Sequence, residues 1–352
     1  MDPALAALGE FGLIRLIRER IRHRSPGTVL GIGDDAAILS HGPGEQLLAT
    51  TDMLLEGVHF KREWGCFHPL GRKTLAVNVS DIAAMGGRPL YALLGLGIPA
   101  AGITLAEVEA LLAGLEAEAE AWGITLAGGD TCGSQSGLVL SVTLLGTVPT
   151  GRAIRRSGAR PGNVLWVTGC LGGSAAGLLA LEMGFRPDAA WPDRVSRPAW
   201  LGPEEEETIQ SAVRTHLTPV PRLAAGQALV GYATAMIDLS DGLASDVGHL
   251  CRESGVGAHL LASQLPIHPG ATTMARWTGR DVLNLALGGG EDYELLFASE
   301  IDPRAILAAR APEVVITRVG EVRAGPPIAT LTGAGGRTDM LTGGFDHFRC
   351  GT

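Results

Sequence analysis

The sequence predicts an α/β (α+β) protein of two layered domains, and three observations support this prediction. At 352 residues the chain is longer than one modest hydrophobic core requires. Segments with strand patterns alternate with segments with helix patterns in both halves. The stretch at 149–163, PTGRAIRRSGARPGN, is rich in Gly, Pro and Arg, as connections between domains often are. We therefore expect an N-terminal domain at 1–150 and a C-terminal domain at 151–352.

The first half reads as a series of strands and helices. Apolar residues at helical spacing favour a helix within 9–24. TVLGIG and AAIL suit two strands around a turn, and QLLATTDMLLEGVHF fits a strand, a polar turn and a short strand. A helix over 70–85 precedes the buried strand RPLYALLGLGIP. A capping box, Thr104 with Glu107, opens a helix that ends at Trp122, and the strands ITLAGGD and GLVLSVTLLGTV follow.

The second half continues the alternation. VLWVTG predicts a strand, CLGG a loop, and SAAGLLALEMG a helix opened by Ser174. The proline-rich, acidic stretch at 185–207 is expected to be a surface excursion. ATAMIDLSDGLASDVGHLC predicts a strand, a turn and a helix, and LNLALGGGEDYELLFAS a segment, a loop and a strand.

Composition excludes several classes of function. The formal net charge of -9 argues against a nucleic-acid surface, which is usually basic. The five cysteines are scattered without a CxxC pair, which fits a reducing cytosol better than a disulfide framework or a zinc site. The N-terminus lacks the pattern of a signal peptide, and Gly, Pro or charge interrupts every long apolar run. We expect a soluble, cytoplasmic protein without a membrane or nucleic-acid partner.

Aspartates follow apolar stretches in five glycine-containing places. A buried carboxylate must be paired, hydrogen-bonded or metal-bound, because an isolated buried charge is very costly. Any one of these motifs alone could be a turn aspartate, and for DLSDG the two readings are balanced. Together they favour a site for a hard cation such as Mg²⁺, which prefers oxygen ligands. The motif residues are Asp34, Asp35, Asp52, Asp81, Asp130, Asp238 and Asp241.

Common phosphate-binding motifs are missing from the sequence. It contains no GxxxxGK[ST] motif, and its only lysines are Lys61 and Lys73. Arg155 and Arg156 could bind a phosphate, or they could be exposed charges of a linker, and the sequence favours neither interpretation. The loop in VTGCLGGSAAG could bind an anion at a helix start or simply make a close turn.

Isolated histidines and cysteines carry weaker signals. His59 could touch a phosphate or a ring, although a structural histidine is commoner. Cys132 has no histidine near it in sequence to activate it, so we expect a small buried residue. His249 and Cys251 are expected to pack on a helix.

The order of motifs along the chain resembles the thiamine-monophosphate kinase family. The resemblance runs from about Gly9 to Phe348. GDD and GGD are shared across the larger group that includes aminoimidazole ribonucleotide synthetase and selenophosphate synthetase, whereas the longer motifs are more specific to the kinase. The motifs are GEFGLI, GIGDDAAIL, TTDMLLEGVHF, NVSDIAAMGG, GGDT, RSGARPG, AMIDLSDGL, GGEDYEL and GGFDHF.

The resemblance implies a fold, an activity and a set of site residues. The fold is the two-domain aminoimidazole ribonucleotide synthetase-like one, whose N-terminal domains bind ATP and metal and pair their sheets across a homodimer. The activity is Mg²⁺-dependent phosphorylation of thiamine monophosphate by ATP, with Asp52, Asp81 and Asp130 catalytic. The implied metal ligands are Asp34, Thr50, Thr51, Asp52, Asp81, Asp130, Asp238 and Asp241. The implied ATP contacts are Gly129, Asp130, Arg156 and Ser240, and the implied substrate contacts are His59, Glu291 and Phe345.

Two departures from the family pattern are visible. Leu112 stands where the family often carries a tyrosine for the nucleotide base, which indicates a less aromatic and less selective nucleotide pocket. Asn163 stands where RPGD is usual, and we interpret it as a turn substitution.

The expected mechanism is direct in-line transfer to the phosphate oxygen of the acceptor. That oxygen is already anionic, so no strong general base is needed, and metal ions offset the repulsion between the two substrates.

Two other functions stay open at this level. One is an aminoimidazole ribonucleotide synthetase-like reaction, in which ATP activates an amide oxygen. The other is a non-catalytic dimeric scaffold, which the full set of acidic motifs makes less favoured. Selenophosphate synthetase is disfavoured because the first cysteine is Cys66, so an N-terminal reactive cysteine is missing.

Overall fold

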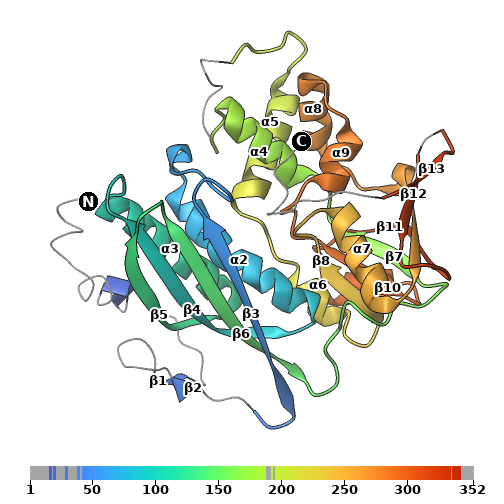
Figure 1. The fold of residues 1–352 in the computed structure, drawn as a ribbon, viewed down its shortest axis with the longest axis horizontal. Helices are drawn as coiled ribbons and strands as arrows, with labels where there is room; N and C mark the ends of the chain where they lie inside the picture. The colour runs from blue at the N-terminus through green and yellow to red at the C-terminus, as the bar shows by residue number, and fades with distance from the viewer. Residues whose placement is uncertain are drawn as a thin grey trace. The chain divides into compact units, whose positions relative to one another are not determined.

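The structure is a computed structural model, and it describes residues 16–17, 19–20, 28–30, 38–39, 42–187, 192, 195–333 and 335–341. The chain divides into two compact units. Unit 1 comprises Met1–Ile82 with Gly87–Gly151, and unit 2 comprises Ala83–Gly86 with Arg152–Thr352. Figure 1 labels the helices and strands of both units. No helix in the described part of the chain is both long and apolar enough to cross a membrane.

Unit 1 contains a four-stranded sheet with two helices on one face (Figure 1). The strands lie in the order β3-β6-β4-β5, with β4 and β5 parallel and the other neighbours antiparallel. The helices are α2 (Phe67–Ala84) and α3 (Leu105–Trp122). The strands are β3 (Glu45–Leu55), β4 (Arg88–Pro99), β5 (Thr125–Ser134) and β6 (Val139–Pro149). Smaller elements are β1 (Thr28–Leu30), β2 (Ile38–Leu39) and η1 (Arg62–Trp64).

Helix α3 begins as the capping box predicts. The Thr104 hydroxyl accepts a hydrogen bond from the Glu107 backbone N–H at 3.3 Å, and the Glu107 carboxylate accepts from the Thr104 N–H at 2.7 Å. Helices α2 and α3 then cross closely at two glycines. A Cβ atom on Gly71 would lie 1.9 Å from the Leu111 carbonyl oxygen, and one on Gly114 would lie 1.9 Å from that of His68. The absence of side chains at both positions lets the two backbones meet.

The predicted turn at Thr50–Asp52 is wrong, because β3 is one continuous strand. Thr50 pairs with Leu144 and Asp52 with Val142 on β6. This ladder satisfies the backbone groups that a turn would have left to solvent, so polar side chains do not interrupt the strand. Likewise, β5 runs past Asp130 to Ser134.

The expectation that all the motif aspartates lie at strand ends therefore holds only in part. Asp52 and Asp130 lie inside strands, and Asp81 lies in the last turn of α2. Asp238 is the last residue of β8 and fits the expectation.

Unit 2 is built on a seven-stranded mixed sheet in the order β13-β12-β9-β11-β7-β10-β8. Every neighbouring pair is antiparallel except β12 and β9. The strands are β7 (Val164–Thr168), β8 (Ala233–Asp238), β9 (Gly257–Leu261), β10 (Leu295–Ser299), β11 (Ile316–Arg323), β12 (Ala329–Thr332) and β13 (Thr338–Met340).

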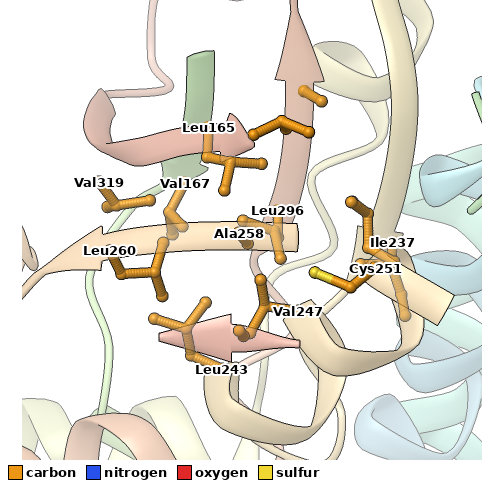
Figure 2. Close-up of a cluster of buried hydrophobic side chains, with 14 of the residues drawn as sticks. Leu165, Val167, Ile237, Leu243, Val247, Cys251, Ala258, Leu260, Leu296 and Val319 are labelled. Carbon is orange, nitrogen blue, oxygen red and sulfur yellow. The ribbon is translucent and has the colours of Figure 1, made fainter. Parts of the chain in front are cut away.

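Each face of this sheet is covered by helices. Helix α7 (Leu243–Ser254) contributes Val247 and Cys251 to an apolar cluster that also contains Leu165 and Val167 of β7 (Figure 2). Trp166 belongs to a second cluster with α6 (Leu223–Ala228) and α10 (Arg304–Arg310). Because successive residues of a strand point to opposite faces, β7 contributes to both cores.

A separate helical group contains α4 (Gly173–Met183), α5 (Pro203–Leu217), α8 (Pro269–Thr278) and α9 (Val282–Gly288), and η2 (Ala262–Gln264) completes the elements. The segment predicted before GGGEDY is thus helix α9. Ser174 does not open α4, since Gly172 occupies the N-cap position.

The excursion predicted at 185–207 is only partly correct. Phe185 is fully buried, and its ring packs edge to face on the Trp277 ring with 5.8 Å between the ring centroids. Residues 203–207 are the first five residues of α5.

Candidate active site

Two carboxylates of unit 1, Asp52 and Asp81, form a half-buried acidic pair. On β3 the even-numbered side chains Thr50 and Asp52 are more buried than Thr51 and Met53 beside them. The Thr50 hydroxyl donates a hydrogen bond to the Asp81 carboxylate, which joins β3 to α2. Burial, the negative charge of Asp81 and a hydrogen bond with it raise the pKa of Asp52 to about 7.

This pair has the chemistry of a magnesium site. It offers only oxygen donors, and its two carboxylates repel each other in partly desolvated surroundings, which is why the pKa of Asp52 is raised. A divalent cation between them would relieve that repulsion, and Mg²⁺ is held in proteins by such carboxylates together with water and substrate phosphates. Among the described residues, no three His, Cys, Asp or Glu side chains gather closely enough to hold a metal ion by themselves.

Other predicted ligands of unit 1 lie elsewhere on the sheet. The Thr51 hydroxyl donates to the Val142 carbonyl oxygen at 3.1 Å and accepts from Thr143 at 3.1 Å, on the face opposite Asp52. Asp130 is exposed on β5, which is separated from β3 by β6 and β4. At strand spacings of 4.7–4.9 Å, β3 and β5 are about 14 Å apart along the sheet. The structure therefore joins Thr50, Asp52 and Asp81 and places Thr51 and Asp130 away from them.

Gly129 shows why glycine is needed before Asp130. Its φ is 155°, and a Cβ there would lie 1.8 Å from the Leu94 carbonyl oxygen of β4. No side chain fits this approach of two backbones.

A second acidic group lies in unit 2, where β8 meets α7. Asp238 ends β8 and is buried, Asp241 follows it, and Asp246 is buried in the first turn of α7. Asp246 accepts a hydrogen bond from the Asp241 backbone N–H at 3.2 Å. Burial is the largest cause that raises the pKa of Asp246 to about 8, and the negative charges of Asp238 and Asp241 add to it. The positive charge of Arg156 lowers this pKa.

The structure thus brings together three predicted residues, Arg156, Asp238 and Asp241, and adds Asp246. Asp246 was not predicted, because it lies outside the DLSDG motif. A signal was present, since the same run continues to a third aspartate at the start of a helix, IDLSDGLASD.

The loop between α9 and β10 lies against the same turn. The Glu291 N–H donates to the Ser240 carbonyl oxygen at 2.8 Å, and the Tyr293 N–H donates to that of Leu239 at 2.9 Å. Glu291 and Tyr293 adopt φ angles of 65° and 50°. Left-handed backbone at non-glycine residues is strained and concentrates at functional sites.

Two buried carboxylates hold this strained loop in place. Asp292 accepts hydrogen bonds from the backbone N–H groups of Gly172 at 2.7 Å and Ser174 at 3.0 Å, at the start of α4. Burial raises the pKa of Asp292 to about 7 despite these bonds. Glu294 accepts two hydrogen bonds from Arg222, at 2.6 and 2.5 Å.

Gly169 makes room for this second anchor. A Cβ on Gly169 would lie 1.9 Å from the Glu294 carboxylate. Gly172 and Gly173 of CLGG are also closely packed, since a Cβ would lie 3.1 Å from the Ala286 nitrogen at Gly172 and 3.0 Å from the His268 ring at Gly173. This close packing is the second of the two interpretations given for that loop.

The remaining predicted residues have varied surroundings. His59 Nδ1 accepts a hydrogen bond from the Leu55 N–H at 3.0 Å and so stabilises the turn after β3. Cys132 is exposed, so the prediction that it is buried is wrong, because β5 extends beyond Asp130 and leaves this position uncovered. Leu112 is fully buried in α3. Asp34, Asp35 and Phe345 lie outside the described residues.

Asn163 acts as the turn residue it was interpreted to be. Its side-chain oxygen accepts hydrogen bonds from the Arg160 N–H at 3.0 Å and from the Thr234 hydroxyl at 2.7 Å.

Comparison with known families gives two adjacent matches. Residues 33–148 match the AIR synthase related protein, N-terminal domain, and residues 160–330 match the AIR synthase related protein, C-terminal domain.

Individual relatives are similar over almost the whole chain. A thiamine-monophosphate kinase of Salmonella typhimurium is 36% identical over 346 residues, covering 97% of this chain and 99% of the relative. The crystal structure of the thiamine-monophosphate kinase from Stenotrophomonas maltophilia superposes with a TM-score of 0.76 at 38% identity, covering 93% of this chain and 97% of that one. AaThiL complexed with AMPPCP and TMP superposes with a TM-score of 0.73 at 32% identity, covering 98% of both chains.

Proposed function

Because the chain belongs to the thiamine-monophosphate kinase family of AIR synthase related proteins, we propose that it transfers the terminal phosphate of ATP to thiamine monophosphate, giving thiamine diphosphate. A relative solved with AMPPCP and TMP supports these two substrates. The observation in this chain that carries the proposal is the half-buried pair of Asp52 and Asp81. In a sequence with two lysines, such a pair offers a way to hold phosphates through cations.

The proposed chemistry is in-line transfer between two bound phosphates. Bound Mg²⁺ supplies positive charge to phosphate oxygens as they approach and react. The acceptor oxygen is already anionic, so the protein's task is to hold and orient both substrates rather than to remove a proton.

We assign functional residues within each unit separately. Asp52, Asp81 and Asp130 are the catalytic carboxylates, and because β5 lies about 14 Å from β3, Asp130 is assigned to a different metal ion from the acidic pair. Unit 1 also provides Asp34 and Thr50 for metal, and unit 2 provides Asp238 and Asp241. Thr51, which was expected to act with Thr50, is left out because its hydroxyl lies on the face opposite Asp52. Gly129, Arg156 and Ser240 are assigned to ATP, and His59, Glu291 and Phe345 to thiamine monophosphate.

We also propose that the protein is a cytoplasmic homodimer. The face of the unit 1 sheet opposite Asp52 exposes Leu47 and Met53, at 55% and 52% of their surfaces. Two large apolar side chains on one sheet face suit burial against a second copy of that face. ATP as co-substrate suits a cytoplasmic enzyme.

Substitution of the acidic pair tests the proposed function. In Asp52→Asn and Asp81→Asn, kcat/KM should fall by about 10³-fold or more at saturating Mg²⁺, because each change removes a charge that holds the reacting phosphates through a cation. Asp302→Asn, which alters an exposed carboxylate paired with Arg304, is the matched control and should keep wild-type activity. Circular dichroism should show an unchanged fold in all three. Near-normal turnover in both site variants would overturn the assignment.

A further inference from the structure

A buried histidine of unit 2 lies between a buried serine and the exposed end of the strained loop. His216, near the end of α5, is 2% exposed and Ser174 is 1% exposed. The His216 Nδ1 atom lies 2.9 Å from the Ser174 hydroxyl and 3.4 Å from a carboxylate oxygen of Glu291. The Glu291 side chain is 21% exposed, so it connects this buried pair to the surface.

The backbone around Glu291 is fixed on both sides. Its own N–H is bonded to Ser240, and the next residue, Asp292, is anchored on the N-terminus of α4. The left-handed φ of 65° at Glu291 therefore sets where its Cβ points. The carboxylate still has three side-chain torsions, and the contact with His216 restricts them.

The charge of Glu291 indicates which part of a substrate it meets. A carboxylate repels a phosphate group and attracts a cation or an N–H donor. Thiamine monophosphate carries a phosphate at one end and a cationic ring system at the other. Glu291 therefore suits the ring end of such a substrate.

We propose that His216, held by Ser174, is a positioning residue that fixes the Glu291 carboxylate for the cationic ring of the phosphate acceptor. The inference rests on the proposed function, since it takes Glu291 as a substrate contact. It adds two residues, His216 and Ser174, to which the sequence motifs gave no role at the substrate.

The position of the contacting nitrogen gives a specific test. Asparagine places its amide near the position of Nδ1, whereas glutamine places it near Nε2. In His216→Gln the KM for thiamine monophosphate should rise about tenfold, because the contact of Nδ1 with the Glu291 carboxylate is lost and the carboxylate is no longer held for the substrate. The KM for ATP and kcat should change by less than about twofold, because neither depends on Glu291. His216→Asn should recover most of the loss.

A double-mutant cycle separates positioning from a general packing effect. In a Glu291→Gln background, His216→Gln should have little further effect on the KM for thiamine monophosphate, because the carboxylate that it positions is gone. His259→Gln is the matched control, since His259 is also buried and hydrogen-bonds to Thr330 and Thr332 on β12. It should leave all kinetic constants unchanged, and melting temperatures should verify that each variant folds.

The outcomes distinguish this inference from the function on which it rests. An unchanged KM in folded His216→Gln, an equal loss in both His216 variants, or additive effects in the cycle would overturn the inference while leaving the kinase assignment in place. Failure of the wild-type enzyme to phosphorylate thiamine monophosphate would overturn both.

Discussion

Asp52 and Asp81 show how neighbouring carboxylates acquire unusual protonation behaviour. Burial and the charge of Asp81 raise the pKa of Asp52 from 3.8 to about 7. A metal ligand must be deprotonated, so a cation bound here competes with a proton. The acidic pair is therefore both a candidate metal site and a group that titrates near neutral pH.

This competition predicts proton release on metal binding. Since the pKa of Asp52 lies near 7, Mg²⁺ binding at pH 6.5 should release a substantial fraction of one proton, and the release should decline towards pH 8.5, where the carboxylate is already ionised. Mg²⁺ affinity should rise with pH over the same range. Titration calorimetry in buffers of different ionisation enthalpy measures both quantities.

Asp52→Asn is the matched variant for this measurement and should release fewer protons than the wild type at pH 6.5, while Asp246, whose pKa is about 8, keeps its own contribution. Equal proton release from the wild type and Asp52→Asn at pH 6.5 would contradict the account.

The sequence predicted which kinds of residue form the candidate site better than it predicted where their side chains lie. Thr50 and Thr51 were expected to act together, but neighbouring residues of a strand point to opposite faces, and only Thr50 meets Asp81. Asp246 and His216 were missed because their partners come from other segments, which a local motif does not reveal.

At the scale of elements, the crossing of α2 and α3 supports the candidate site, because α2 carries Asp81. The crossing depends on Gly71 and Gly114, where a Cβ would lie 1.9 Å from a carbonyl oxygen of the facing segment. Since neither backbone can move without displacing its helix, a methyl group at either position should force the helices apart.

Alanine substitution tests this crossing. Gly71→Ala and Gly114→Ala should each lower the free energy of unfolding by about 2 kcal/mol, even though alanine favours helices, because overpacking outweighs the gain in propensity. Gly248→Ala on α7 is the matched helical control, since its Cβ would meet only the end of the flexible Arg252 side chain. Urea denaturation measures the three effects. Equal stability in all three variants would contradict close helix packing at the glycines.

Helices and strands whose ends depend on neighbouring residues could be predicted from the sequence. Those that depend on pairing with residues far along the chain were predicted less well. The capping box of Thr104 and Glu107 located the start of α3. In contrast, the polar run Thr50–Asp52 was interpreted as a turn, although pairing with β6, about 90 residues later, makes it a strand. Helix α4 begins at Gly173 beside the carboxylate of Asp292, which comes 120 residues after Gly172 in the chain.

At the scale of the whole molecule, alternation of helices and strands correctly predicted the α/β class. It did not predict that the unit 2 sheet is mostly antiparallel, because strand order depends on which distant segments pair. The order β7-β10-β8 matters for the site. Because β10 runs antiparallel to both neighbours, the CLGG loop after β7, the DLSDG loop after β8 and the GEDYE loop before β10 lie at the same ends of these three strands.

The exposed face of the unit 1 sheet predicts the oligomeric state. Replacing both Leu47 and Met53 by glutamate should convert a homodimer into a monomer, because burying like charges opposite each other is unfavourable. Light scattering coupled to size-exclusion chromatography measures the mass. Val315→Glu, on an exposed site of unit 2, is the control and should leave the mass unchanged. A wild-type monomer, or a dimer that survives both substitutions, would contradict the prediction.

The central claim is that this chain is a magnesium-dependent kinase for thiamine monophosphate. The most direct test incubates the protein with thiamine monophosphate, ATP and Mg²⁺ and resolves the products by chromatography. The account predicts thiamine diphosphate and ADP in equal amounts, with both lost on chelation of the metal. Folded, nucleotide-binding protein that forms no thiamine diphosphate would contradict it, and would direct attention to reactions in which ATP activates an amide.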